Sequence, residues 1–371
     1  MSTIPDYKPG LEGVIASETK VSLLDVEQEE IVIRGYNLIE LAEKVSYLEV
    51  AGLLLNGELP GRQQQQEMQQ EISHYLELPD YLTSVFPLFP SSMGMMDRLR
   101  TGVSMLAGEA FDLDDRSKTA NKRKTMHLLG ALPSLVAGSY RSRAKQEVLR
   151  PLSRLSFSAN FLYMMTGSEP SQREADTFDQ SLSLYSEHEL PNSTFAARVI
   201  ASTNSDIYGA MTGAVASLKG PLHGGANEEV MKMLLQAQTP EGLKELLYAR
   251  LAAKERIMGF GHRVYMKKMD PRATLMKKSL YDLAQDKNRM DLYELCELGE
   301  TIMAQKKGLY PNLDYYAAPV YYLLGIPIEL YTPVFFAARA AGIGAHIIEQ
   351  QENNRLFRPR VRYTGPRGLH P

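Results

Sequence analysis

The sequence contains very little cysteine: Cys296 is the single cysteine among 371 residues. One thiol cannot form a disulfide within the chain, and a cysteine-based zinc site needs several thiolates. This composition is typical of a reducing compartment, and we therefore expect a cytoplasmic protein.

Long apolar runs and an excess of basic residues are also missing. The N-terminal residues contain no apolar signal core, and no apolar stretch reaches the roughly 20 residues that a membrane span requires. The formal net charge is −3 with both signs interspersed, whereas a nucleic-acid-binding protein would show a basic stripe. We therefore expect no membrane partner and no nucleic-acid partner.

Motifs for nucleotide phosphates and for metals are absent or incomplete. The sequence has no Walker A motif and no Rossmann fingerprint, which disfavours phosphate hydrolysis and hydride transfer. Glu187 and Glu189 flank His188, but they would lie on different faces of a helix, and the sequence has no H-x-x-x-H pair. We therefore predict no catalytic metal.

The patterning predicts a mainly α-helical fold with two lobes. A chain of 371 residues is longer than one hydrophobic core usually serves. Short β-type runs at Val21–Asp25 and Glu30–Arg34 predict a small N-terminal hairpin, and after Gly35 the pattern becomes helical. The fold class is thus all-α with a short N-terminal β-hairpin.

Helix boundaries are marked by local signals. Asp270 before Pro271 predicts a helix start, and Thr332 before Pro333 predicts another. Gly308 predicts a helix end. The helix around Gly209–Leu218 is dominated by small residues, which allow close packing of helix axes. It is either an interior helix of one chain or part of a subunit interface.

His223 lies in a turn just before a predicted helix. The positive end of the helix dipole disfavours a protonated imidazole there. A neutral histidine in such a place can donate a hydrogen bond to a carbonyl oxygen, as in other enolising enzymes. The alternative is a turn histidine that bonds to local backbone.

His262 follows two glycines that allow the backbone to approach a ligand closely. Lys267, Lys268 and Arg272 come shortly after it, and four such groups would suit an anionic ligand. The alternative is a solvated basic loop.

Asp314 and Arg339 complete the set of candidates. Asp314 lies in the first turn of a predicted helix, where it either stabilises the dipole or acts as a base. Arg339 has almost only small or apolar neighbours, so its guanidinium must be paired or bind an anion unless it extends to solvent. Arg358 belongs to a basic C-terminal segment that is either packed or mobile.

Together, these segments resemble the citrate synthase family over essentially the whole chain. The matching motifs occur in order along the sequence: His188–Thr194, His223–Asn227, Gly261–Tyr265, Asp270–Arg272 and Asn312–Asp314. Details in Tyr163–Gly167 and Tyr310–Pro319 look similar to 2-methylcitrate synthases of the Bacillus type.

The resemblance implies an all-α homodimer whose sites are shared across the interface. Residues 1–224 and 323–371 would form a large domain and residues 225–322 a small inserted domain. The helix near 207–218 would pack at or near the dimer interface. Acyl-CoA is implied as a co-substrate, with no permanently bound cofactor.

The family's residue roles transfer onto matching positions. Asp314 corresponds to the base that removes the α-proton of the acyl-CoA, His223 to the residue that stabilises the enol, and His262 to the residue that polarises the oxaloacetate carbonyl. Oxaloacetate carboxylates would be held by His188, Arg272, Arg339 and, from the other subunit, Arg358. Lys267 and Lys268 would lie near the coenzyme A phosphates.

The implied reaction joins propionyl-CoA or acetyl-CoA to oxaloacetate, giving 2-methylcitrate or citrate. The alternatives are a dedicated citrate synthase and, more distantly, a non-catalytic helical binding protein. Residues Tyr315–Ala318 replace the Phe-Tyr-Ser-Gly of many citrate synthases. We expect this difference to reshape the acyl pocket, where one methylene is worth only about 1–3 kcal/mol.

Overall fold

The computed structural model describes residues 7–110, 112–261 and 268–371. His262 and Lys267, two of the predicted site residues, lie outside the described residues. The helices of the described part are α1 (Leu38–Lys44), α2 (Tyr47–Asn56), α3 (Arg62–Tyr75), α4 (Asp80–Val85), α5 (Met95–Met105), α6 (Lys118–Arg143), α7 (Phe157–Thr166), α8 (Gln172–Tyr185), α9 (Asn192–Ala201), α10 (Ile207–Leu218), α11 (Ala226–Ala237), α12 (Pro240–Ala252), α13 (Pro271–Asp286), α14 (Met290–Lys307), α15 (Leu313–Leu323) and α16 (Tyr331–Glu352).

The predicted N-terminal hairpin is confirmed, with one addition. Strands β1 (Ser22–Asp25) and β2 (Glu30–Ile33) pair antiparallel with Asp25 opposite Glu30. A short third strand, β3 (Tyr36–Asn37), pairs with β2 and leads directly into α1. Everything else in the described chain is helix or connection, so the all-α class is correct.

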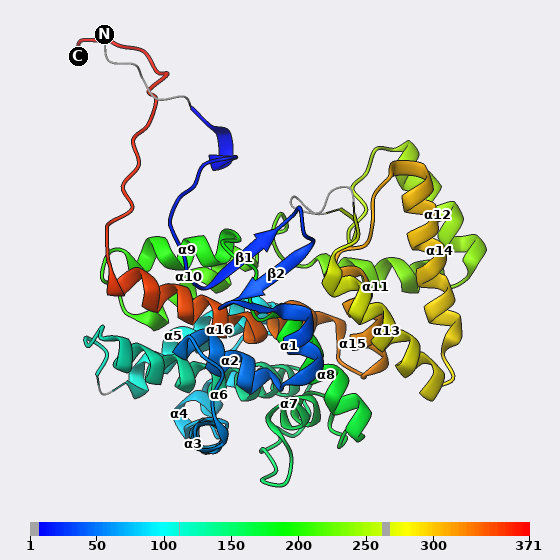
Figure 1. Ribbon diagram of the computed structural model, residues 1–371, viewed down its shortest axis with the longest axis horizontal. Coiled ribbons are helices and arrows are strands. Elements are labelled where there is room, and N and C mark those ends of the chain that lie inside the picture. Colours follow the sequence, from blue (N-terminus) through cyan, green and yellow to red (C-terminus); the bar gives the residue numbers. More distant parts are fainter. Residues whose placement is uncertain (1–6, 111, 262–267) are drawn as a thin grey trace.

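Helix α16 forms the centre of the larger group of helices (Figure 1), where it packs against α6, α8 and α9. It is buried along almost its whole length. Its small residues make this possible: a Cβ on Gly344 would lie 2.4 Å from Thr125 Cγ2 of α6. Because a larger side chain would not fit there, Gly344 allows α6 and α16 to approach closely.

Helices α11 to α15 form a second group on one side of the molecule (Figure 1). They pack mainly against one another, with α15 against both α11 and α13. Contacts of α13 with α8 and of α11 with α16 join this group to the larger one. The junction between the two groups therefore contains the end of α8 and the start of α11.

Most predicted helix boundaries are correct, and one is wrong. The Asp270 carboxylate accepts the Arg272 N–H at the start of α13, and α14 ends at Gly308 with φ of 61°. Helix α16 does not begin at a Thr332 cap, because a 3-10 turn (Ile328–Leu330) already leads into it at Tyr331. The Thr332 hydroxyl instead donates to Glu228 on α11.

The small-residue helix α10 packs closely within its own chain. It lies against α9, α5 and α16, and a Cβ on Gly213 would meet Ile200 Cδ1 of α9 at 2.1 Å. Ala210 and Ala214 are fully buried. The small residues thus serve packing inside the subunit, while Gly209, Thr212 and Ala216 keep some exposure.

None of the helices in the described part combines the length and the apolar composition that crossing a membrane would need.

Candidate active site

Two distant turns lie side by side at the junction of the helix groups. The Gly261 N–H donates to the Tyr310 carbonyl at 2.9 Å, and the Asn312 N–H donates to the Gly259 carbonyl at 2.9 Å. The Asn312 side-chain amide also donates to the Gly261 carbonyl at 3.1 Å. The chain that leads into His262 is therefore bonded to the turn that precedes Asp314.

Asp314 lies in the first turn of α15 and faces the end of α8. The Tyr185 hydroxyl donates to its Oδ1 at 2.6 Å. Burial raises the pKa of the Asp314 carboxyl, although the Tyr185 hydrogen bond and the positive charges of Arg272 and Arg339 act in the opposite direction. A carboxylate with a raised pKa is a stronger proton acceptor than an exposed aspartate.

His223 lies in the turn between α10 and α11, and Ser193 fixes its ring. The Ser193 backbone N–H donates to His223 Nε2 at 3.1 Å, and Ser193 Oγ lies 2.9 Å from the same nitrogen. A backbone N–H can only donate, so Nε2 accepts and the neutral ring carries its proton on Nδ1. Burial and the nearby Arg339 charge lower the pKa of His223 to about 4.

His223 and Asp314 line the same small cavity. Asn227 from α11 and Phe335 from α16 complete much of its wall. Gly225, with φ of +82°, lets the chain turn sharply from His223 into α11. The cavity thus brings together a neutral hydrogen-bond donor, His223, and a buried carboxylate, Asp314, which are 91 residues apart in the sequence.

The two predicted arginines are buried beside this cavity. Arg272 Nε and Nη2 donate to Asp270 at 3.0 and 2.7 Å. Arg339 Nε donates to the Tyr185 carbonyl, and its guanidinium lies 4.7 Å from the centre of the Phe335 ring. Arg339 is only 2% exposed, so its guanidinium does not extend to solvent.

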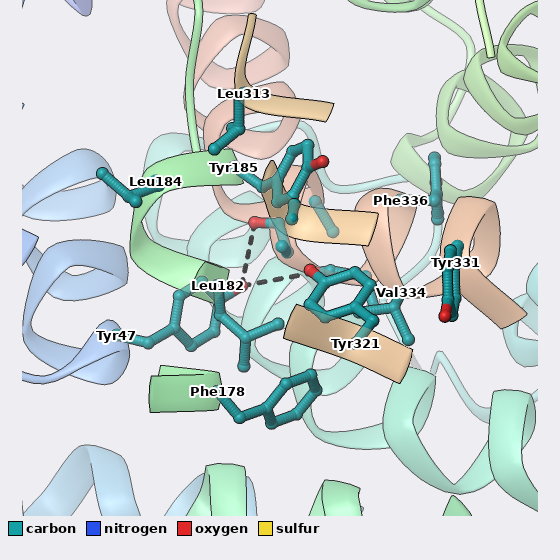
Figure 2. Packing of buried hydrophobic residues seen from close by; sticks show 14 of the residues in the cluster. Tyr47, Phe178, Leu182, Leu184, Tyr185, Leu313, Tyr321, Tyr331, Val334 and Phe336 are labelled. Atoms are coloured by element: carbon teal, nitrogen blue, oxygen red, sulfur yellow. Dashed lines mark hydrogen bonds between the residues drawn. The ribbon is translucent and has the colours of Figure 1, made fainter. Parts of the chain in front are cut away.

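The loop between α8 and α9 connects these groups. It carries His188, which is 8% exposed, and it follows Tyr185, the last residue of α8, and precedes Ser193 in the first turn of α9. The Tyr185 ring packs edge-on against Phe335 at 4.9 Å and lies next to Tyr321 in the buried cluster of Figure 2. The helix ends that flank this loop therefore contact Asp314, Arg339 and His223.

Two other predicted residues lie apart from this group. Lys268 is exposed and pairs with Glu29 in the turn between β1 and β2. Arg358 is exposed in the C-terminal segment that leaves the end of α16 and runs away from the body (Figure 1). The chain itself therefore does not bring these two cations to the cavity.

Sequence reasoning missed Tyr185 and gave Ser193 no role. Tyr185 ends an amphipathic helix, on its buried face, and has no local feature that distinguishes it from a core tyrosine. Ser193 belongs to the motif that begins at His188, which was the only signal that could have identified it. Both act on residues more than 25 positions away, as the contacts Tyr185–Asp314 and Ser193–His223 show.

The two tyrosines that follow Asp314 contact helix α14, and the expected effect of residues Tyr315–Ala318 on the acyl pocket stays a prediction. The Tyr315 hydroxyl donates to the Cys296 carbonyl of α14 at 2.8 Å, and the Tyr316 hydroxyl donates to Glu300 on the same helix. Neither tyrosine lines the cavity that contains Asp314. These side chains stabilise the contact between α14 and α15.

Comparison with known proteins agrees with this fold. The family model described as citrate synthase, C-terminal domain, matches residues 10–360. The chain therefore belongs to the citrate synthase family of acyltransferases.

Two curated relatives cover nearly the whole chain. A citrate/2-methylcitrate synthase of Bacillus subtilis (strain 168) is 59% identical, and the match covers 97% of each chain. A citrate synthase of Heyndrickxia coagulans is 57% identical, with 98% of this chain and 97% of that chain covered.

Solved structures give the same result. The citrate synthase of Thermoplasma acidophilum, in a ternary complex with carboxymethyl coenzyme A and oxaloacetate, matches with a TM-score of 0.92 at 30% identity, covering 98% of both chains. The citrate synthase of Thermotoga maritima matches with a TM-score of 0.87 at 34% identity, covering 97% of this chain and 96% of that chain.

Proposed function

We propose that this protein condenses an acyl-CoA thioester with oxaloacetate and releases coenzyme A. The observation that carries this proposal is the pairing of a neutral His223 and a buried Asp314 on one cavity. Relatives named citrate synthase and citrate/2-methylcitrate synthase support it.

The first step is removal of a proton from the α-carbon of the thioester. Such a proton is too weakly acidic for a carboxylate alone, so developing negative charge on the thioester oxygen must be stabilised. Asp314 accepts the proton, and the Nδ1–H of His223 donates to the oxygen. The Ser193 N–H bonded to Nε2 keeps this tautomer in place.

The second step joins the α-carbon to the carbonyl carbon of oxaloacetate. His188, Arg272 and Arg339 hold the substrate carboxylates, because buried guanidinium groups bind and orient carboxylates strongly. His262 polarises the carbonyl and protonates its oxygen. Water then hydrolyses the thioester, which releases coenzyme A as its thiol.

Closure and a second subunit complete the proposed site. Residues 225–322 form a small domain that closes on a large domain of residues 1–224 and 323–371, which excludes water from the enol. Arg358 reaches the site of the other subunit in a homodimer, and Lys267 and Lys268 bind coenzyme A phosphates. The protein acts in the cytoplasm without a permanently bound cofactor.

We favour 2-methylcitrate synthesis from propionyl-CoA, together with citrate synthesis from acetyl-CoA. The name of the Bacillus subtilis relative covers both activities, whereas that of the Heyndrickxia coagulans relative supports a dedicated citrate synthase. Thiol release should be measured with each acyl-CoA and oxaloacetate, and kcat/KM compared. A strong preference for acetyl-CoA would overturn the assignment to 2-methylcitrate.

The same assay tests the chemistry through Asp314→Asn. We expect this nearly isosteric change to lower kcat by about 10²–10⁴-fold, the usual contribution of a general base. Folding should be unaffected, as judged by circular dichroism and the unfolding temperature. Near-normal turnover of the variant would refute the role of Asp314.

A further inference from the structure

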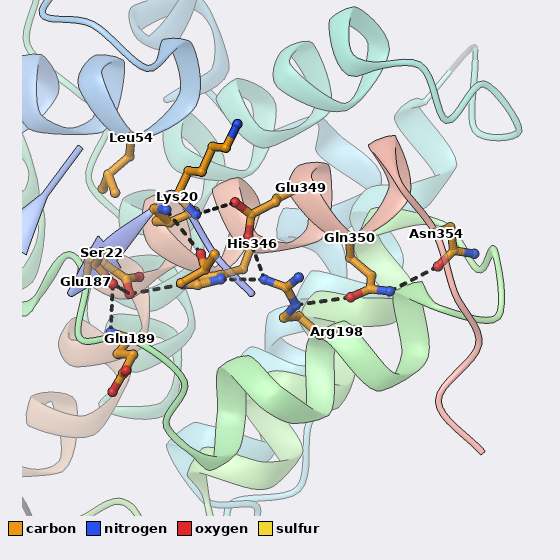
Figure 3. Close-up of polar contacts among 12 residues, drawn as sticks. Lys20, Ser22, Leu54, Glu187, Glu189, Arg198, His346, Glu349, Gln350 and Asn354 are labelled. Atoms are coloured by element: carbon orange, nitrogen blue, oxygen red, sulfur yellow. Dashed lines mark hydrogen bonds and ion pairs between the residues drawn. The ribbon is translucent and has the colours of Figure 1, made fainter. Parts of the chain in front are cut away.

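Glu187, His346 and Arg198 form a buried polar network next to the loop that carries His188 (Figure 3). His346 Nε2 lies 3.1 Å from Glu187 Oε1, and His346 Nδ1 lies 2.9 Å from Arg198 Nη1. Glu187 and His346 are fully buried, and Arg198 is 3% exposed. These three residues come from the α8–α9 loop, α16 and α9.

The hydrogen bonds of this polar network fix which ring nitrogen of His346 carries the proton. A guanidinium can only donate, so Nδ1 of His346 accepts from Arg198 and carries no hydrogen. The Nε2–H of His346 then donates to Glu187, which accepts as a carboxylate. His346 is therefore a neutral imidazole of fixed tautomer between a cation and an anion.

Glu187 connects the polar network to the residues that we propose to bind the substrate. It directly precedes His188, and its charge acts on Arg339, which is on the same helix as His346. Burial raises the pKa of Glu187, but His346, Arg339 and the Ser22 hydroxyl outweigh this effect, so the net pKa is lowered. The carboxylate thus stays charged beside Arg339.

Strand β1 holds the same loop from its other side. The Ser22 hydroxyl donates to Glu187 Oε1 at 2.8 Å and accepts the Glu189 N–H at 3.1 Å. The Glu187 side chain and the Glu189 backbone N–H, on the two sides of His188, are therefore held by contacts with β1 and α16. None of Glu187, His346 and Arg198 lines the cavity that contains Asp314.

We propose that Glu187, His346 and Arg198 are positioning residues that hold His188 and Arg339 in the geometry needed to bind a dicarboxylate. This inference rests on the proposed function, because it concerns the residues that position the oxaloacetate-binding side chains of that site. The polar network does not contact the reacting atoms directly. It acts through the α8–α9 loop and α16.

Arg198 also connects this network to the C-terminal segment. Its Nε donates to Gln350 Oε1 at 3.1 Å, and Gln350 Nε2 donates to Asn354 Oδ1 at 3.1 Å and to the Arg355 carbonyl at 3.3 Å. The Phe357 ring packs edge-on against Phe195 of α9 at 5.6 Å. The same guanidinium therefore orders the start of the segment that carries Arg358.

Two substitutions of His346 separate positioning from simple stabilisation. His346→Leu removes both hydrogen bonds, whereas His346→Gln keeps an amide donor for Glu187 and a carbonyl acceptor for Arg198. His127→Leu is the matched control, because His127 also bonds to a buried partner, Tyr208, but is on α6 away from the network.

The dissociation constant of oxaloacetate should be measured by calorimetry on the intact protein, with the unfolding temperature and both KM values. We expect His346→Leu to weaken oxaloacetate binding by about 10- to 100-fold, as is usual when a supporting contact of a binding residue is lost. The KM for acyl-CoA should stay unchanged. His346→Gln should regain most of the affinity, and His127→Leu should lower only the unfolding temperature.

Ser22→Ala covers the case in which His346→Leu does not fold. It removes one hydrogen bond from Glu187 and one from the Glu189 N–H, but it keeps the contact of Glu187 with His346. We therefore expect a smaller loss of oxaloacetate affinity with unchanged KM for acyl-CoA. An active protein whose foldable His346 and Ser22 variants keep wild-type affinity would overturn the positioning role alone. A wild-type protein that neither binds oxaloacetate nor releases coenzyme A would overturn the proposed function and this inference together.

Discussion

The cations predicted to bind anionic substrates lie in two contrasting regions. Arg272 and Arg339 are 5% and 2% exposed and have hydrogen-bond partners within the chain. Lys268 and Arg358 are exposed, one against a surface glutamate and one on the C-terminal segment. The same charge therefore serves two different physical purposes.

Buried cations must be compensated in the absence of substrate, and this requirement fixes their geometry. Asp270 holds Arg272 through two hydrogen bonds, and the Tyr185 carbonyl holds Arg339. Leaving such charges unpaired would cost several kcal/mol. The region around them is therefore already arranged for a small, rigid dianion.

Exposed cations carry no such requirement. Lys268 and Glu29 are more than 40% exposed, so water screens their interaction strongly. Lys268 and Arg358 are the cations for which we propose contacts with coenzyme A phosphates and with a second subunit.

Among the tests of the contrast between buried and exposed cations, we expect the largest loss of activity for Arg339→Ala. Breaking a buried charge pair costs about 3–5 kcal/mol, so kcat/KM for oxaloacetate should fall by about 10²–10⁴-fold. Arg339→Lys keeps the charge without the planar fork and should be intermediate. Steady-state kinetics at saturating acyl-CoA measure both variants. A nearly normal KM in Arg339→Ala would show that burial of this cation has no role in binding.

Mixing two inactive variants tests whether Arg358 serves a neighbouring subunit. Arg339→Ala and Arg358→Ala should each be inactive alone. In a randomly exchanged homodimer population, one site in four has both arginines, so activity should recover to about a quarter of the wild-type value. Subunit exchange is followed with differently tagged chains. If exchange is complete and no activity returns, Arg358 does not act across the interface.

The titration of His223 tests whether the buried region disfavours an additional positive charge. Its pKa in the folded protein is about 4, below the ordinary 6.5, because burial and the charge of Arg339 disfavour the imidazolium. Between these pH values the unfolded chain binds more protons, so this residue's contribution to stability is lost as the pH falls from 6.5 towards 4.

Ring-proton NMR measures this titration, with His223→Gln to assign the signal. The unfolding temperature of the wild type should also fall more between neutral and acidic pH than that of His223→Gln. A His223 midpoint at or above 6.5 would contradict the neutral role of this ring.

The smallest effect is expected for Lys268→Ala. A surface charge pair contributes at most about 1 kcal/mol, so KM for acyl-CoA should rise by less than about fivefold. The difference from wild type should shrink at high salt, because exposed charges are screened. Glu29→Gln is the matched control, since it frees Lys268 without removing it. A large, salt-independent loss would place Lys268 with the buried cations.

The sequence predicted those features that depend on neighbouring residues. The hairpin Val21–Arg34, the Asp270 cap and the end of α14 at Gly308 all follow from local backbone preferences. The start of α16 was predicted wrongly because a 3-10 turn precedes it and Thr332 bonds to distant Glu228.

The sequence did not predict the roles of residues whose partners are distant along the chain. Tyr185 has no local mark of its bond to Asp314, and Glu187 was considered only as part of an incomplete metal motif. Tyr315 likewise has no local mark of the hydrogen bond that its hydroxyl donates to the Cys296 carbonyl of α14. Only the packing of helices decides which way such side chains point.

The sequence by itself determined the helical fold class, the family and the candidates His223, Asp314, Arg272 and Arg339, since residue type and spacing carry this information. The tertiary structure decided that Ser193 sets the tautomer of His223 and that Tyr185 contacts Asp314. It also decided which cations are buried. The physical reason is that protonation and burial depend on distance in space, which a linear sequence does not contain.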